Sequence, residues 1–426
     1  MIPSSAQASP NTSKTVGMSQ LETRGAREVN PNMVPGILVL ADWYLPGTKS
    51  GGTVSAIANM IELVGDEFRF RVITRDRDLN ERSAYTGVET DRWIPVGKAR
   101  VLYASSLSFS KLRRHILDTA PDLIYLTSFF SPWTRRILLL RRLGLLPVSA
   151  VVLAPQGEFS AGALSLKRVR KCLYQQVTNA AGLYRDLTWH ACSDLEEQQI
   201  TAAGIANGAR NRGRFVVTPN VPSPRLVELP VESQRRTKRP GAVRLIFLSR
   251  ISQMKNLLFV LRSLASVRDQ VELAIVGPAE DAAYWAACQK QIRTLPKNVV
   301  VSSAGTVRHE LVSRAFLQHH FLILPTLGEN FGYAILEALA AGCPVLISDQ
   351  TPWRDLRAAG VGWDLPLSRT DLWQDALQEC IAMDEASFQS MSHRARCFAE
   401  RWVSFPFFHR DKVNLFRSAL DSVASQ

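Results

Sequence analysis

Two acidic side chains, Glu329 and Glu337, stand eight residues apart where an apolar strand leads through a Gly-containing loop into a helix. Asn330 is placed to cap this helix, which we expect to begin at about Phe331. The backbone N–H groups from Asn330 to Gly332 and the positive end of the helix dipole would then form an anion site. An anion site of this kind suits a diphosphate.

The order of these groups suggests how a ligand would lie. Glu337 comes about two turns into the predicted helix, about 9 Å beyond its start. A nucleotide sugar alongside would place sugar hydroxyls near Glu329, phosphates at the helix N-terminus and ribose hydroxyls near Glu337. The spacing fits equally well a solvated helix N-terminus whose acidic residues favour the dipole.

Two basic residues follow another apolar strand, residues 244–248. Arg250 and Lys255 would both lie at the carboxyl edge of a sheet, where two cations can neutralise a leaving diphosphate. Arg binds an anion in a bidentate manner, whereas Lys acts as a point charge. Because basic residues are common at helix starts, the pair alone indicates little.

A third motif, Gly51-Gly52, lies in the loop between the first predicted strand and the first predicted helix. Paired glycines let the backbone come close to a phosphate or a sugar. A flexible tight turn explains the same residues equally well.

Short apolar strands alternate with longer helical segments from Gly36 onward. The strands are nearly continuous apolar runs, which is typical of strands buried on both faces of a parallel sheet covered by helices. We expect strands over residues 37–41, 70–74, 123–127, 150–155, 188–192, 215–219, 244–248, 272–276, 299–303, 321–325 and 345–348. The expected helices are 53–64, 132–143, 165–180, 194–203, 256–266, 281–294, 307–318 and 331–341, with further helical segments over 372–402.

The pattern predicts an α/β protein with two doubly wound, Rossmann-like halves. Ligands in such folds bind in the cleft outside the carboxyl ends of the strands. The first residues lack an apolar signal-peptide region and read as a disordered leader or an over-extended start. The expected divisions are a leader 1–33, an N-terminal acceptor-binding domain 34–221, a linker 222–241, a C-terminal donor domain 242–404 and a terminal helix 405–426 returning to the first domain.

The amino-acid composition limits the classes of partner that the protein is expected to bind. The chain carries 51 Lys and Arg against 38 Asp and Glu, a net charge of +13, which favours phosphates, an anionic bilayer or nucleic acid. No nucleic-acid-binding motif is recognisable. No apolar run reaches the roughly 18 residues of a membrane span. Six scattered cysteines without a C-x-x-C pair indicate reduced thiols in a cytoplasmic protein.

A basic segment of the first half permits two interpretations. Residues 167–171, Lys-Arg-Val-Arg-Lys, alternate with apolar side chains on a predicted helix, and Arg135, Arg136, Arg141 and Arg142 lie on another. Such a segment could rest on the inner face of an anionic cytoplasmic membrane. A solvated basic helix face explains it equally well.

Together the motifs resemble family 4 (group 1) glycosyltransferases of the GT-B fold, a retaining class, over residues 36–402. Glu329 and Glu337 match the family's E-x7-E motif, and Arg250 and Lys255 match its Arg-(x4)-Lys donor-phosphate pair. The resemblance implies catalytic roles for Glu329, Arg250 and Lys255.

Further segments extend the resemblance. Gly51-Gly52 looks like the family's glycine loop, and residues 275–278 and 304–307 resemble segments that line its nucleotide pocket. Val307 would lie near the base. The resemblance thus assigns the donor to Gly51, Gly52, Val307, Asn330, Phe331, Gly332 and Glu337.

The acceptor residues follow less directly. Several relatives have His or Arg near Gln156, where this chain has Gln; Gln156 and Glu158 are the expected acceptor-binding residues, with a plain loop carboxylate the alternative for Glu158. Asp76-Arg77-Asp78 matches the metal-binding D-x-D pattern of the other transferase fold, GT-A. We expect no metal and no cofactor, because the basic pair and the helix end already supply positive charge.

The implied reaction moves a sugar from a UDP- or GDP-sugar to a hydroxyl of a glycan or lipid-linked acceptor, with retention at the anomeric carbon. Surface polysaccharide or lipopolysaccharide biosynthesis is the setting that the family suggests. A nucleotide-sugar epimerase or phosphorylase on the same architecture is one alternative. A non-catalytic protein that binds anionic surfaces is another.

Overall fold

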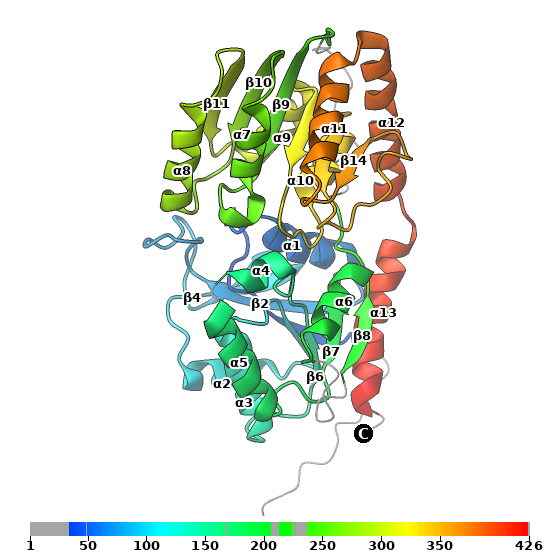
Figure 1. The fold of residues 1–426 in the computed structure, drawn as a ribbon. Helices are drawn as coiled ribbons and strands as arrows, with labels where there is room; N and C mark the ends of the chain where they lie inside the picture. The colour runs from blue at the N-terminus through cyan, green and yellow to red at the C-terminus, as the bar shows by residue number, and fades with distance from the viewer. Residues whose placement is uncertain are drawn as a thin grey trace, which may run out of the picture. The chain divides into compact units, whose positions relative to one another are not determined.

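The computed structural model describes residues 34–47, 49–166, 168–205, 213–223, 226 and 237–424. The expected leader 1–33 and most of the expected linker 222–241 lie outside these residues. The described residues belong to one compact unit, in which two sheets are each covered by helices (Figure 1).

The first sheet has eight strands in the order β3-β4-β2-β1-β5-β6-β7-β8. Neighbouring strands are parallel except for the pair β3 and β4, which is antiparallel. The order reverses direction between β1 and β5, so the loops that follow these two strands diverge there. The strands are β1 (Gly36–Leu40), β2 (Arg69–Arg75), β3 (Trp93–Val96), β4 (Ala99–Ala104), β5 (Leu123–Leu126), β6 (Ala150–Leu153), β7 (Thr188–Ala191) and β8 (Arg214–Val217).

Helices cover this first sheet because its strands are apolar on both faces; all four residues of β5, β6 and β7 are buried. The sequence pattern missed β3, β4 and α2, since β3 is a half-exposed edge strand with a proline and α2 is strongly polar. The helices are α1 (Gly52–Val64), α2 (Phe109–Thr119), α3 (Pro132–Arg142), α4 (Ala161–Ser165), α5 (Arg168–Ala180) and α6 (Asp194–Ala202).

The second sheet has six parallel strands in the order β11-β10-β9-β12-β13-β14. This is the doubly wound arrangement, with its switch point between β9 and β12. The strand β14 was not expected from its short Gly-Trp-Asp-Leu sequence. The strands are β9 (Ala242–Leu248), β10 (Gln270–Val276), β11 (Val299–Gly305), β12 (Phe321–Leu324), β13 (Val345–Ser348) and β14 (Gly362–Leu365).

The helices of this half bury their apolar faces in one continuous core with the second sheet. A single 3₁₀ turn, η2 (Gln253–Lys255), precedes the first of them. They are α7 (Leu257–Leu264), α8 (Ala282–Ile292), α9 (His309–Leu317), α10 (Tyr333–Ala340), α11 (Thr370–Ala382) and α12 (Glu385–Val403).

The last helix, α13 (Phe407–Ala424), follows α12 but packs against the first sheet, in red in Figure 1. Its Phe416 ring meets Phe68 at 5.2 Å and both Phe70 and Tyr125 at 5.8 Å between ring centroids. The chain thus ends on its own first half. Within the described part of the chain, no helix is both long enough and apolar enough to cross a membrane.

Candidate active site

The two strongest motifs meet at the switch point of the second sheet. The backbone carbonyl of Met254, in the loop after β9, accepts hydrogen bonds from Leu327 N at 2.8 Å and Thr326 Oγ1 at 3.1 Å, both in the loop after β12. These bonds join the two loops because β9 and β12 are neighbouring parallel strands whose carboxyl ends lie at the same edge.

The structure brings Lys255 and Glu329 into direct contact. Their side chains form an ion pair and are only 10% and 18% exposed. Arg250 is not joined to this pair; its Nη1 donates to both carboxylate oxygens of Glu280, at 2.8 and 2.9 Å. A phosphate bound at this edge would therefore compete with Glu329 for Lys255 and with Glu280 for Arg250.

The expected start of α10 was wrong by two residues. The helix begins at Tyr333, and the residue before it is Gly332, with φ of 83° and no side-chain cap. This left-handed backbone suits glycine and turns the chain into the helix. Glu337 consequently lies in the second turn, about 6 Å beyond the helix start, closer than expected.

Asn330 does not cap α10, contrary to the sequence prediction. Its amide lies across the interface with the first half, within 3.2 Å of Gln156 Oε1 and 3.1 Å of Cys192 Sγ. With its nitrogen toward the Glu196 carboxylate, the amide donates at 2.7 and 3.1 Å. Gln156 itself has a positive φ of 57°. The loop between β12 and α10, to which the family resemblance assigns the donor and which is called the donor loop below, is therefore attached to the loop after β6 and to the start of α6.

Phe331 is buried and faces inward. Its ring packs against Tyr333 at 4.6 Å, Trp402 at 5.2 Å and Trp353 at 5.9 Å. The indole nitrogen of Trp353 also donates to the Phe331 carbonyl at 2.5 Å. The side chain thus fixes the loop, and its backbone is the part left to face a ligand.

The carboxylate of Glu337 is held in a low-dielectric setting. Burial raises the pKa of Glu337 to about 7. Among the residues that the structure describes, none gives it a hydrogen bond or an ion pair. Glu337 is half-buried, and its carboxylate is suited to accept hydrogen bonds from ligand hydroxyls.

The glycine loop reaches α10 from the first half. A Cβ on Gly52 would lie 3.0 Å from the ring of Tyr333, so the start of α1 packs against the side chain of the first residue of α10. Gly51, with φ of 65°, precedes α1, and Gly52 is its first residue. The N-termini of α1 and α10 therefore lie close together, and both present backbone N–H groups without partners inside their helices.

The segments expected to line the nucleotide pocket also lie beside this edge. Gly277 N donates to Gly305 O at 2.8 Å, and a Cβ on Gly277 would lie 2.0 Å from the Ser249 carbonyl oxygen. The loops after β9, β10 and β11 are thus packed backbone to backbone. Val307, half-buried, packs against the core of this half.

The sequence of this half matches one known family. Residues 242–381 match the model of "Glycosyl transferases group 1". Residues 242–381 thus form a group 1 glycosyltransferase domain, and the chain is a glycosyltransferase. No curated protein matches the full sequence.

Solved structures show the same fold over the whole glycosyltransferase. Sucrose-phosphate synthase from Thermosynechococcus elongatus superposes with a TM-score of 0.67 at 15% identity, over 91% of this chain and 100% of that one. WaaG, a glycosyltransferase involved in lipopolysaccharide biosynthesis, gives 0.61 at 14% identity, over 92% and 100%. Anabaena HepE, solved with UDP-glucose, gives 0.60 at 17% identity, over 92% and 100%. The expected GT-B fold is confirmed.

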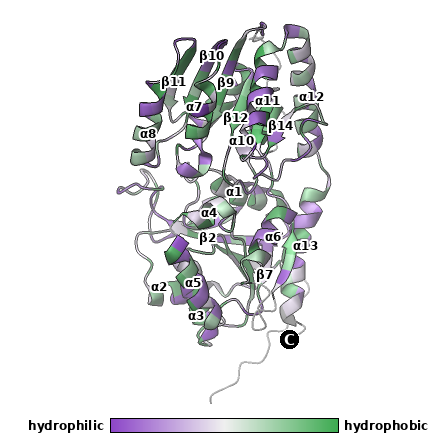
Figure 2. Ribbon diagram, in the orientation of Figure 1, coloured by the Kyte–Doolittle hydropathy of each residue, from purple (hydrophilic) through white to green (hydrophobic). Residues whose placement is uncertain are grey.

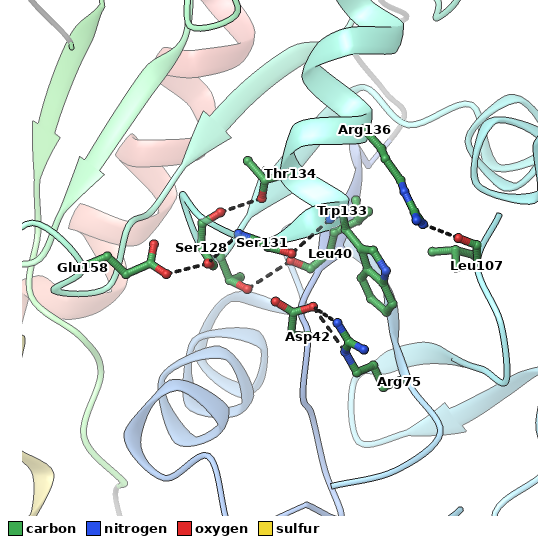
Figure 3. Close-up of polar contacts among 11 residues, drawn as sticks. Leu40, Asp42, Arg75, Leu107, Ser128, Ser131, Trp133, Thr134, Arg136 and Glu158 are labelled. Atoms are coloured by element: carbon green, nitrogen blue, oxygen red, sulfur yellow. Dashed lines mark hydrogen bonds and ion pairs between the residues drawn. The ribbon is translucent and has the colours of Figure 1, made fainter. Parts of the chain in front are cut away.

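On the first half of the glycosyltransferase, Glu158 is occupied by its own chain. Its carboxylate accepts a hydrogen bond from Ser128 Oγ at 2.7 Å (Figure 3). It also accepts from Phe129 N at 2.5 Å and Phe130 N at 3.3 Å. Burial raises the pKa of Glu158 to about 7 against these hydrogen bonds. This environment is that of a carboxylate that fixes the loop after β5, and an acceptor role for it stays a prediction.

The sequence analysis overlooked a polar cluster at the carboxyl edge of the first sheet. The guanidinium of Arg75 donates to Asp42 Oδ1 at 3.0 and 3.3 Å and lies over the rings of Trp43 and Trp133, at 5.8 and 5.5 Å from their centroids. Figure 3 shows Arg75 between Asp42 and Trp133. A signal was present, since Asp42 follows β1 directly and Arg75 ends β2.

The Asp76-Arg77-Asp78 segment is engaged internally. Asp76 pairs with Arg77 at 2.7 Å, and Asp78 accepts from the backbone nitrogens of Lys49 and Leu79. Within the described ranges, no three His, Cys, Asp or Glu side chains are grouped so as to hold a metal ion.

Beneath Asn330, a buried polar chain leads to α13. Lys412 Nζ lies 3.0 Å from His190 Nε2 and 3.3 Å from the Thr218 carbonyl, and His190 Nδ1 contacts the Tyr125 hydroxyl at 2.7 Å. His190 is thus a hydrogen-bonded core histidine. Burial lowers the pKa of Lys412 to about 8 and that of His190 well below its usual range.

Proposed function

We propose that this glycosyltransferase moves a sugar from a UDP- or GDP-sugar to a hydroxyl of a glycan or lipid-linked acceptor, with retention at the anomeric carbon. The observation that carries the proposal is the contact between Gly52 and Tyr333. It brings two helix N-termini together next to the Lys255–Glu329 pair. Oriented backbone N–H groups with nearby cations favour a diphosphate over a neutral ligand.

In this proposal the donor lies along α10. The diphosphate would occupy the helix N-terminus at Gly332, with Arg250 and Lys255 on its oxygens. Glu329 would orient the transferred sugar and Glu337 the ribose hydroxyls. Val307 would lie near the base, and Gly51 and Gly52 would close over the phosphates from the first half.

The proposed chemistry needs no side-chain base. The acceptor oxygen bonds to the anomeric carbon on the face from which the diphosphate departs, and the bond from that carbon to the phosphate oxygen breaks. The electron pair goes to the diphosphate, which also receives the proton of the acceptor hydroxyl. Arg250, Lys255 and the N-terminus of α10 stabilise the charge that develops on the leaving group.

Two of the similar structures support the finer assignment. HepE was solved with UDP-glucose, and WaaG takes part in lipopolysaccharide biosynthesis. The likeness to these two proteins favours a UDP-sugar donor and a surface-glycan acceptor for the present chain.

We place the acceptor at the edge of the first sheet. Asp42 accepts and Arg75 donates hydrogen bonds, and the indoles of Trp43 and Trp133 offer apolar faces, a combination suited to sugar rings. Gln156 stands nearest to the donor loop and is proposed to contact the acceptor directly. Glu158 would act by holding the loop after β5.

A thermal-shift screen of UDP, GDP, ADP and their sugars tests the donor site. A ligand that binds the native state raises the melting temperature, and we expect this for one nucleotide class only. The shift should disappear in Arg250→Ala and in Glu337→Ala. No shift with any nucleotide in folded protein would overturn the proposal.

A transfer assay separates transfer from other reactions of nucleotide sugars. Glu329→Gln should lower turnover by about a hundred-fold while nucleotide affinity changes little, because the residue faces the sugar. Donor consumption without an acceptor would indicate an epimerase, and dependence on free phosphate a phosphorylase. Either result would contradict the proposal.

A further inference from the structure

The helix α5 turns apolar side chains toward solvent. Val169, Leu173 and Val177 are 81%, 60% and 58% exposed, and their spacing of four residues puts them on one face. Cys172 and Ala180 are exposed beside them. Figure 2 shows hydrophobic residues alternating with hydrophilic ones along this helix. This row of side chains is called the α5 stripe below.

The face of α5 that packs on the protein is the more polar one. The Tyr174 hydroxyl donates to the Phe129 carbonyl at 3.4 Å, and Lys171 Nζ donates to the Ala163 carbonyl at 2.5 Å. Thr178 is buried and donates to the Tyr174 carbonyl. The orientation is thus fixed by several contacts, and the apolar row is left outside by the fold itself.

A second exposed apolar group lies at the end of α3. Leu143, Leu145 and Val148 are 59%, 42% and 88% exposed. Arg141 Nη1 donates to the Arg185 carbonyl at 2.7 Å and so ties this end of α3 to the segment that follows α5. The two helices are drawn next to each other in Figure 1. Exposed apolar side chains grouped in this way are typical of a binding face.

The charge around this surface is mainly positive, although Asp186, which follows Arg185, is exposed and interacts with Arg141. Residues 123–185 contain nine Lys or Arg residues and a single acidic residue, Glu158. That carboxylate is hydrogen-bonded to the loop after β5 and does not offset the exposed cations. Arg168 and Arg170 are exposed on α5 itself, and Arg142 at the end of α3. Lys167 lies outside the described residues.

We infer that the α5 stripe and the end of α3 dock on an anionic lipid bilayer. Apolar side chains flanked by cations suit the boundary between acyl chains and acidic headgroups. A second copy of the chain fits less well, because a symmetric contact would set Arg168 and Arg170 against the same cations. The docking does not depend on the proposed donor chemistry.

The position of the surface relates it to the active site. α4 lies between the α5 stripe and the donor loop, and a Cβ on Gly162 in α4 would lie 2.6 Å from the Leu327 carbonyl oxygen. This placement matters if the proposed acceptor is lipid-linked. A bilayer docked on the α5 stripe would then present the acceptor to the donor loop from the side that α4 covers.

Cosedimentation with vesicles tests the docking. Wild-type protein should bind phosphatidylcholine vesicles that contain phosphatidylglycerol and not pure phosphatidylcholine vesicles. The triple variant V169S/L173S/V177S, which keeps every charge, should bind the anionic vesicles at least about ten-fold more weakly. The affinity of the variant R168E/R170E for the anionic vesicles should fall about five-fold for each charge removed, and by more at low salt.

Matched controls lie on the second half. Val300→Ser removes an exposed valine of similar exposure (59%), and K290E/R293E reverses two exposed cations on and after α8. Both should bind vesicles like the wild type. Equal binding by the stripe variants and these controls would overturn the inference, as would wild-type protein that stays unbound.

Labelling gives a readout without changing the stripe. In a Cys397→Ser background, the exposed Cys172 is the accessible thiol, since the other four cysteines are buried. A polarity-sensitive fluorophore on Cys172 should shift to the blue with anionic vesicles. A blue shift that grows with protein concentration alone would indicate a second copy instead, and would refute the bilayer as the occupant.

Discussion

Glu337 shows how one residue links burial to binding. Its carboxyl has a pKa of about 7 because it is buried. The neutral form therefore prevails below pH 7 and the carboxylate above it. The pKa of Glu337 is higher in the folded state than in the unfolded state, so this carboxyl adds to the free energy of unfolding at low pH. That contribution to stability is lost as the pH rises through about 7.

The same titration predicts a pH-dependent affinity for nucleotide. A carboxylate accepts hydrogen bonds from both ribose hydroxyls, whereas the protonated form has lost acceptor capacity. We expect the affinity of the wild type to rise about ten-fold from pH 6 to pH 8, measured by calorimetry. Glu337→Gln should bind weakly with a flatter profile. An unchanged pH dependence in that variant would assign the effect to another group, such as the nucleotide phosphate.

At the scale of the element, the start of α10 depends on Gly332. Its φ of 83° is unfavourable for any residue with a Cβ, and an added Cβ would lie 2.8 Å from Ile335 Cδ1 and 3.1 Å from Trp353 Nε1. The loop and the helix therefore meet in one conformation. That conformation also sets the position of Glu329 relative to the helix N-terminus.

Gly332→Ala should separate this constraint from general stability. We expect the free energy of unfolding to fall by about 1–2 kcal/mol from the strained backbone, and nucleotide binding to fall further because the loop moves. Gly87→Ala is the matched control: its φ is 76°, and a Cβ there would meet nothing within 4 Å. In denaturant unfolding, Gly87→Ala should lose only the free energy that the strained backbone costs. Its affinity for nucleotide should equal that of the wild type. Similar affinities in the two variants would contradict a role for this turn.

At the scale of the whole molecule, the two halves are joined by buried contacts as well as by the chain. Asn330 reaches the loop after β6, and α13 carries Lys412 into the core of the first half. A cation buried there is costly when charged, which is why its pKa falls to about 8. Lys412 therefore lowers the stability of the folded state while it is charged.

Lys412→Met tests this cost. The folded pKa of about 8 lies below the usual value of 10.5, so in the wild type this lysine makes stability rise as the pH increases from about 8 to 10.5. We expect the wild type to gain up to about 3 kcal/mol relative to the variant across this window. Urea unfolding at both ends of it measures the difference, with Lys290→Met, exposed on α8, as control. Parallel pH profiles for wild type and Lys412→Met would refute the assignment.

Local sequence patterns were sufficient to predict the architecture and the motifs. Strands that are apolar on both faces require a parallel sheet covered by helices, and that requirement is local to each strand. The motifs after β9 and β12 were recognisable because residue types and spacing carry them. The weak edge strands β3 and β14 escaped because they are short and carry little apolar pattern.

Only the tertiary structure decided which side chains meet. Gln156 and Asn330 are 174 residues apart, and no local pattern could show that the amide crosses to the first half instead of capping α10. Arg250 faces Glu280 for the same reason. The apolar row of α5 has the period of a core-facing helix, and it points outward because the half-buried Tyr174 and the buried Thr178 face the protein instead. The spacing of apolar residues predicts that a helix has an apolar and a polar face, and tertiary packing decides which of the two is covered.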